Sequence, residues 1–190
     1  MTPPLILGFD TSGPHCAATL IEADVVLCTY GEDMARGQAE RLMDLLEEVL
    51  ASQGKSWSDL DALAVGTGPG NFTGIRIGVS AARGLALGLK IPAYGVTGFE
   101  ARAKVSPMGA LIAIPAPRDM VYVSDARGPR MIPAADVTDA APNPTPADLA
   151  TGAALRAAQL WPTPPAPPAP FYVRAPDAAP ARDAPPRILT

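Results

Sequence analysis

Short apolar runs separated by turns open the chain. They lie at residues 5–9 (LILGF), 16–22 (CAATLIE) and 25–31 (VVLCTYG), and the intervening turns span only residues 11–14 and 23–24. Connections this short join antiparallel neighbours, because parallel strands need a crossover of a dozen or more residues. The pattern therefore predicts a three-stranded antiparallel meander.

A helical period follows in "QAERLMDLLEEVLASQG" (38–54). Leu45 falls off the main apolar stripe toward the polar side, which indicates a surface that is sometimes covered. The next apolar run, residues 60–66 (LDALAVG), is reached by this helix, so it is predicted to be a strand parallel to its neighbour. The apolar positions of the helix recur at intervals of three and four: Ala39, Leu42, Met43, Leu46, Val49 and Leu50.

The following segments complete a recognisable order of elements. Residues 74–89 and 98–104 have helical composition, and residues 92–96 form a further strand between them. A lobe of the actin-like, ribonuclease H-like ATPase (ASKHA) fold begins with this order of strands and helices. The predicted fold class is therefore α/β, with a mixed five-stranded sheet and helices in the N-terminal lobe and a reduced second lobe.

The remainder of the chain has weaker signals. Residues 110–126 read as a hairpin that turns near Arg118 and Asp119, and residues 147–160 are compatible with one helix. From residue 142 onward lie 13 of the 23 prolines, a density that breaks regular structure. The expected divisions are an N-terminal lobe at 1–104, a proline-rich second lobe at 105–175 and an extended or disordered tail at 176–190.

The segment "GTGPGNFTGIRIG" (66–78) holds five glycines and one proline. It is not a phosphate-binding loop of the G-x-x-x-x-G-K-[ST] kind, because it has no lysine. The dinucleotide fingerprint G-x-G-x-x-G also fails, since its third glycine falls on Asn71 or Thr73. A structural glycine loop that turns the chain tightly is predicted instead, formed by Gly66, Gly68, Pro69 and Gly70.

Small residues then recur at every fourth position: Gly70, Gly74, Gly78, Ala82 and Ala86. On a helix these positions line one ridge, which lets another element approach closely. The ridge faces either the protein's own sheet or the helix of a partner, and periodicity does not separate the two. We expect the ridge to face a partner. The predicted contact residues are Leu42, Leu45, Leu46, Gly74, Gly78 and Ala82.

Candidate chemistry is sparse. Asp10 and Thr11 end the first strand, where actin-like ATPases place a metal-coordinating carboxylate, so they mark a vestigial nucleotide site unless Asp10 only caps the turn. The single histidine, His15, excludes a His–His metal pair, and Cys16 and Cys28 lack the CxxC spacing of metal or redox motifs. Neither catalytic residues nor a metal site are predicted.

Net charge and hydropathy further narrow the functional classes to which the protein could belong. The net charge of −4 argues against a protein that holds nucleic acid unaided, because such binding needs a basic face. The N-terminus does not have the pattern of a signal peptide, and no apolar run approaches the length of a membrane span. We expect a cytoplasmic protein without membrane contact.

Three stretches together resemble the TsaB (YeaZ) family: "LGFDTSGPHCAATLI", "QAERLMDLLEEVLASQG" and "DLDALAVGTGPGNFTGIRIGVSAARGLALGLKIPAYGVTGFEA". The resemblance covers residues 5–104 well and resumes faintly at 121–123 and 171–178. It implies a non-catalytic scaffold subunit that pairs with TsaD, which transfers a threonylcarbamoyl group to the tRNA adenosine next to the anticodon. It also implies that TsaE docks on the pair, that the chain alone forms a homodimer, and that ATP and tRNA enter only through the complex.

Two other classes stay open at this point. An actin-fold enzyme acting alone, such as a kinase or a peptidase, should show a second phosphate segment or metal ligands, which the sequence lacks. A nucleotide-binding regulator needs only Asp10, Thr11 and the glycine loop.

Overall fold

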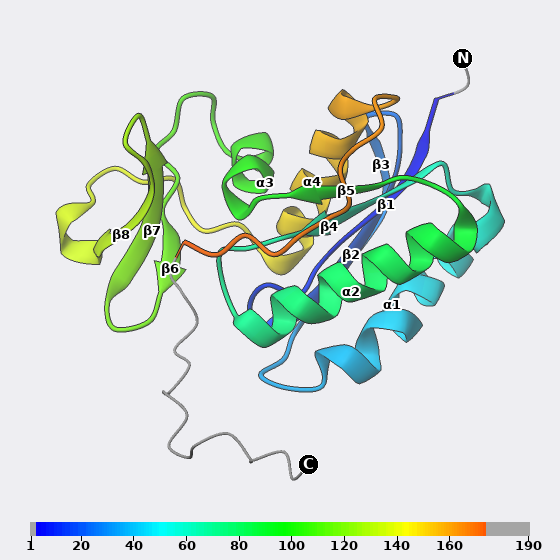
Figure 1. The fold of residues 1–190 in the computed structure, drawn as a ribbon, viewed down its shortest axis with the longest axis horizontal. Coiled ribbons are helices and arrows are strands. Elements are labelled where there is room, and N and C mark those ends of the chain that lie inside the picture. The colour runs from blue at the N-terminus through cyan, green and yellow to red at the C-terminus, as the bar shows by residue number, and fades with distance from the viewer. Residues whose placement is uncertain (1–2, 174–190) are drawn as a thin grey trace, which may run out of the picture.

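Two β-sheets organise the computed structural model, which describes residues 3–173 (Figure 1). The larger sheet has the order β3-β2-β1-β4-β5, and its strands pair antiparallel at β1–β2 and β2–β3 but parallel at β1–β4 and β4–β5. The predicted meander and the parallel strand are therefore confirmed. The strands are β1 (Leu5–Asp10), β2 (His15–Glu22), β3 (Val25–Asp33), β4 (Ala62–Gly66) and β5 (Ala93–Val96).

Four α-helices cover both faces of this sheet (Figure 1). Leu7 and Phe9 of β1 point into the core beneath α1 and α2, whereas Ile6 points into the core beneath α3 and α4. Because both faces are buried, the central strands read as continuous apolar runs. The structure has the predicted α/β, actin-like architecture. The helices are α1 (Gln38–Ser52), α2 (Phe72–Leu89), α3 (Gly98–Val105) and α4 (Pro146–Leu160), with 3-10 turns at Trp57–Asp59 and Ala134–Asp136.

Helix α4 forms where a helix was predicted, although prolines surround it. Thr145 caps its N-terminus and exchanges hydrogen bonds with Asp148, while Pro146 occupies the first helical position, where no amide donor is needed. The helix follows the second sheet in sequence yet packs on β1 and β2 of the first, and a Cβ at Gly8 would meet Ala150 O at 2.8 Å. The predicted division of the chain into lobes at 1–104 and 105–175 stays a prediction.

The second sheet is antiparallel, with the order β6 (Ile114–Ala116), β7 (Met120–Asp125) and β8 (Gly128–Pro133). The predicted hairpin between β6 and β7 is confirmed, and Arg118 and Asp119 make its turn with φ of 63° and 55°. The sequence did not reveal β8, because prolines occupy its second and last positions. Such prolines are tolerated because β8 lies at the edge of the sheet.

The proline-rich segment 162–171 runs beside β5, without helix or strand structure of its own. The Tyr94 hydroxyl donates to Thr163 O at 3.0 Å, and the Phe171 amide donates to Thr67 O at 2.8 Å. These bonds hold the segment along the edge of the large sheet. The tail predicted at 176–190 lies outside the described residues.

The buried face of α1 differs from the predicted stripe. Leu45 was expected on the polar flank, but it is fully buried, whereas Met43 is 38% exposed. The spacing of three, one and three residues through Leu42, Leu45, Leu46 and Val49 follows the helical period, so the stripe passes through Leu45. The expectation that Leu45 lies at the surface is wrong.

Candidate functional site

The first hairpin turn and the glycine loop meet where β1 and β4 end. Asp10 closes β1 and Gly66 closes β4, and the carboxyl ends of parallel strands lie at the same edge of a sheet. A Cβ at Gly66 would overlap Asp10 Oδ2. The glycine is therefore required because the Asp10 carboxylate lies against the backbone of β4.

Asp10 is held by its own turn. Its Oδ1 accepts hydrogen bonds from the amide and the hydroxyl of Ser12, both at 2.8 Å, and Nε2 of His15 lies 2.8 Å from the same oxygen. Burial raises the pKa of Asp10, but the hydrogen bond and charge of His15 and the bonds from Ser12 together hold that pKa below its usual value. The ionised carboxylate thus caps the turn, which was the alternative to a metal ligand.

Thr11 and Ser12 touch the glycine loop directly. The Thr11 hydroxyl donates to Gly74 O at 2.7 Å, and the Asn71 amide donates to Ser12 O at 2.7 Å. Cβ atoms at Gly70 and Gly74 would overlap the carbonyl oxygens of Ser12 and Thr11. The two loops are therefore in backbone contact and leave no room for a phosphate between them.

The glycine ridge of α2 continues this contact along the protein's own sheet. A Cβ at Gly78 would lie 2.7 Å from Thr11 Oγ1 and 3.3 Å from Val65 Cγ2. This corrects the expectation of a ridge offered to a partner, since close packing on the sheet accounts for the small residues. All six residues assigned to a partner contact are buried within the chain: Leu42, Leu45, Leu46, Gly74, Gly78 and Ala82.

The glycine loop itself also bonds to the neighbouring helix. Gly68 has a φ of 96°, a region that favours glycine, and its carbonyl accepts the Gly98 amide at 2.7 Å. Asn71 then caps α2 by accepting the Gly74 amide at 2.9 Å. The loop thus links the starts of α2 and α3.

A feature that the sequence reasoning missed lies beside this junction. Arg102 of α3, His15, Gly70 and Asn143 line a hollow of about 180 Å³ between the hairpin turn, the glycine loop and the second sheet. Basic residues in the last turn of a helix are common, so Arg102 gave no separate signal in the sequence.

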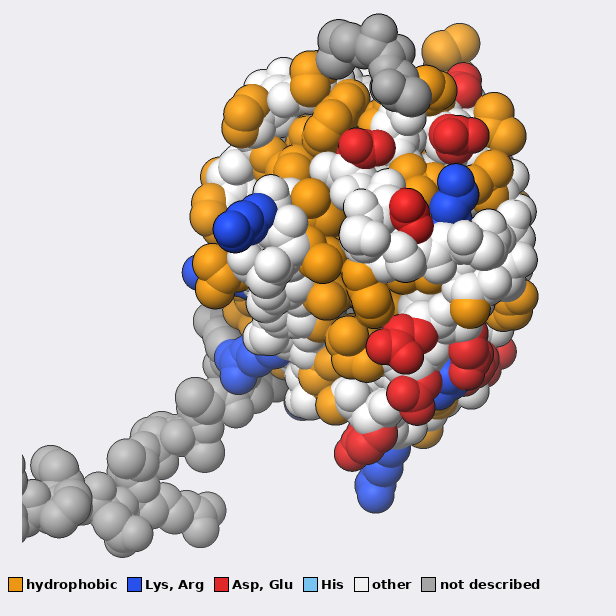
Figure 2. All heavy atoms as spheres, turned by 90° about the vertical axis from the view of Figure 1, so that its right-hand side faces the viewer, with side chains coloured by type: hydrophobic (Ala, Val, Ile, Leu, Met, Phe, Trp, Pro, Cys, Tyr) orange, Lys and Arg blue, Asp and Glu red, His pale blue; other side chains and the backbone are white. Residues whose placement is uncertain are grey.

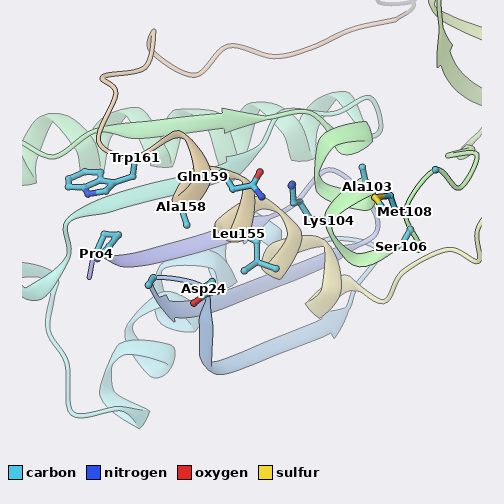
Figure 3. Close-up of a pocket in the computed structure, with 12 residues that line it drawn as sticks. Pro4, Asp24, Ala103, Lys104, Ser106, Met108, Leu155, Ala158, Gln159 and Trp161 are labelled. Atoms are coloured by element: carbon cyan, nitrogen blue, oxygen red, sulfur yellow. The ribbon is translucent and has the colours of Figure 1, made fainter. Parts of the chain in front are cut away.

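A larger hollow lies elsewhere, over α3, α4 and the β2–β3 turn (Figure 3). It measures about 740 Å³, and its wall includes Leu155, Met108 and Trp161 together with single charges at Asp24 and Lys104. None of the sequence-predicted site residues lines it. A lone acid and a lone base in a largely apolar wall do not form a catalytic group.

Within residues 3–173, no three or more His, Cys, Asp or Glu side chains gather in a way that could hold a metal ion. In the same part of the chain, no helix is both long enough and apolar enough to cross a membrane.

Comparison with known proteins gives the family. The model of the TsaD family, tRNA N6-adenosine threonylcarbamoyltransferase, matches residues 30–157. The TsaB protein of Escherichia coli, named for tRNA threonylcarbamoyladenosine biosynthesis, is 39% identical over 92 residues. The chain belongs to the TsaB (YeaZ) family. The aligned part spans 48% of this chain and 39% of the E. coli TsaB protein.

Other relatives extend the likeness to TsaB-family proteins. An uncharacterized protein of Mycobacterium tuberculosis is 34% identical, and the alignment covers 92% of this chain and 94% of that protein. YeaZ from Pseudomonas aeruginosa superimposes with a TM-score of 0.55 at 30% identity, covering 73% of this chain and 67% of the other. A second Pseudomonas aeruginosa structure, described as similar to peptidase YEAZ, reaches a TM-score of 0.70 at 24% identity and supports the fold.

The contact at Gly74 predicts opposite effects of two alanine substitutions on one helix. Gly74→Ala should lower the free energy of unfolding by about 1–3 kcal/mol, because its Cβ meets the Thr11 carbonyl. Gly84→Ala, which meets no atom within 4 Å, should raise it by about 0.5–1 kcal/mol. Urea unfolding followed by circular dichroism measures both; equal stability of the two variants would contradict the packing described.

The buried Asp10 carboxylate predicts that replacing this residue lowers the free energy of unfolding by an amount that depends on pH. Asp10→Asn should lower the free energy of unfolding at pH 7 by about 1–3 kcal/mol, because it removes the charge facing His15. Since the pKa of Asp10 is lower in the folded protein, the stabilisation is present above about pH 3.9 and is lost as the pH falls below it.

Urea unfolding across this pH range provides the measurement. The difference in free energy of unfolding between wild type and Asp10→Asn should become smaller in acid. The exposed control Asp44→Asn should have the free energy of unfolding of the wild type at every pH. A constant difference down to acid pH would argue against an ionised Asp10.

Proposed function

We propose that this chain is a non-catalytic subunit of the machinery that makes threonylcarbamoyladenosine in tRNA, and that it acts by pairing with TsaD. The likeness to TsaB proteins and to the TsaD family model supports this role. The observation that carries the proposal is the closed backbone contact between the Thr11–Ser12 turn and the glycine loop, which leaves no room for a phosphate between them.

The closed site also argues against the two alternatives, an enzyme acting alone and a nucleotide-binding regulator. Oδ1 of Asp10 is bonded to Ser12 and His15, and the other carboxylate oxygen, Oδ2, lies against Gly66. Thr11 is bonded to Gly74. In this proposal ATP and tRNA are bound only by the complex, and TsaE docks on the TsaB–TsaD pair.

The outer sides of α1 and α2 offer a surface for pairing, because their inner sides are filled by the core. Leu87 on α2 is 82% exposed and Met43 on α1 is 38% exposed, both large apolar side chains. Figure 2 views the side of the molecule where these helices end, and a band of hydrophobic side chains crosses it beside acidic ones. Exposed apolar groups gathered in this way mark contact surfaces.

A hollow of about 640 Å³ lies beside Leu87 and adds to this surface. It is formed between the C-terminal half of α2 and the proline-rich segment, with Gly84, Pro165 and Pro168 in its wall. TsaD belongs to the same fold family, so it would present the equivalent helices. A two-fold pairing of that kind also permits a homodimer when this chain is alone.

A charge at Leu87 tests the pairing surface. Leu87→Asp should weaken capture of the same organism's TsaD about tenfold or more, because it places a charge in an apolar contact. Met108→Asp is the matched control, since Met108 is also exposed but lies between α3 and β6, away from the outer sides of α1 and α2. Pull-down and sedimentation measure both variants, with circular dichroism to establish folding. Equal capture of TsaD by the two variants would overturn this surface.

Reconstitution tests the role itself. The chain alone should neither hydrolyse ATP nor modify tRNA, because the described residues assemble no catalytic group. Added to the same organism's TsaD and TsaE, it should raise the formation of threonylcarbamoyladenosine, measured by mass spectrometry of digested tRNA. ATP hydrolysis by the isolated chain that is lost in Asp10→Ala would refute the proposal.

A further inference from the structure

The hollow over α3, α4 and the β2–β3 turn has the size and composition of a ligand site (Figure 3). Its volume of about 740 Å³ falls within the roughly 300–1,000 Å³ of sites that hold small molecules, and like them it combines a mainly apolar wall with a few polar groups. The wall comes from four separate parts of the chain: Pro4, the β2–β3 turn, the end of α3 with the loop after it, and the C-terminal half of α4 with Trp161. It shares no residue with α1 or α2, so it is separate from the proposed pairing surface.

The apolar part of this wall is open to solvent. Met108 is fully exposed, and Leu155 and Trp161 are only partly buried. Large apolar side chains that gather around an exposed hollow are unfavourable in water, and an apolar molecule that covers them removes their surface from the solvent. An occupant that suits this wall therefore has an apolar body.

The charged part of the wall consists of one base and one acid that do not pair with each other. Lys104 on α3 is half-buried, and Asp24 in the β2–β3 turn is exposed. No ion pair within residues 3–173 involves either side chain. In the view of Figure 3 the two lie on opposite sides of Leu155. The wall is therefore complementary to a molecule that has an apolar body and charges of opposite sign at its two ends.

We propose that this hollow binds a short apolar peptide with free termini, with its carboxylate at Lys104 and its ammonium group at Asp24. The apolar side chains of the peptide contact Leu155, Met108 and Trp161. A compact hollow of this volume is about 11 Å across, and three extended residues span about 10 Å, so a tripeptide has the length that the hollow accepts. Because the wall holds no catalytic group, the peptide is bound and not cleaved.

Trp161 provides the signal for the test, because it lies in the wall and the other tryptophan, Trp57, does not. In the full chain carrying Trp57→Phe, added trileucine should change the fluorescence of Trp161 saturably, with half-saturation below about 1 mM. Lys104→Met and Asp24→Asn should each raise the concentration at half-saturation about threefold to fivefold, because each removes one ion pair with the peptide. Lys55→Met is the matched control at an exposed lysine outside the hollow, and it should leave that concentration unchanged.

Blocked peptides give a second measurement that leaves the charged residues of the protein unchanged. N-acetyl-trileucine lacks the ammonium group and trileucine amide lacks the carboxylate, so each should bind about threefold to fivefold more weakly than trileucine. The amide should bind equally well with and without Lys104→Met, because the group that pairs with this lysine is gone. Absence of saturation, equal binding of trileucine and the doubly blocked peptide, or an effect of Lys104→Met that persists with the amide would each overturn the proposal.

Discussion

The backbone contact between the Thr11–Ser12 turn and the start of α2 determines the edge of the sheet where β1 and β4 end. Hydrogen bonds join Asn71 N to Ser12 O and Thr11 Oγ1 to Gly74 O, each at 2.7 Å. These bonds exist only because Gly70 and Gly74 carry no Cβ. The same contact fixes the position of α2 on the sheet and closes the space that a phosphate would need.

The antiparallel meander and the parallel direction of β4 could be predicted from the sequence, because short turns and one crossover helix leave few arrangements. The orientation of two helix faces could not be settled in this way. Periodicity shows that Gly74 and Gly78 share a face but not what covers it, and the stripe of α1 was placed through Met43 instead of Leu45. The position of α4 and the surroundings of Arg102 depend on segments far apart in sequence, which no local pattern reports.

The turn around Asp10 also accounts for the absence of an acidic partner at Arg102 among the described residues. A carboxylate at the end of β1 would be the natural partner of Arg102, but Ser12 and His15 take its Oδ1. A turn stabilised in this way leaves a neighbouring positive charge without a direct partner. A carboxylate free to approach the guanidinium would pair with it.

The most distinctive motif of the chain, the glycine-rich segment 66–78, forms a packing contact inside the protein and not a contact with another protein. Gly66, Gly74 and Gly78 are constrained by atoms of the same chain, so changes there act on folding. The outer positions of α2 meet no such constraint, because Leu87 is largely exposed and a Cβ at Gly84 would meet no atom within 4 Å. Recognition of a partner on that side can therefore change while the fold is kept. Under the proposed pairing, partner choice would depend on outer residues such as Leu87, which no motif identifies.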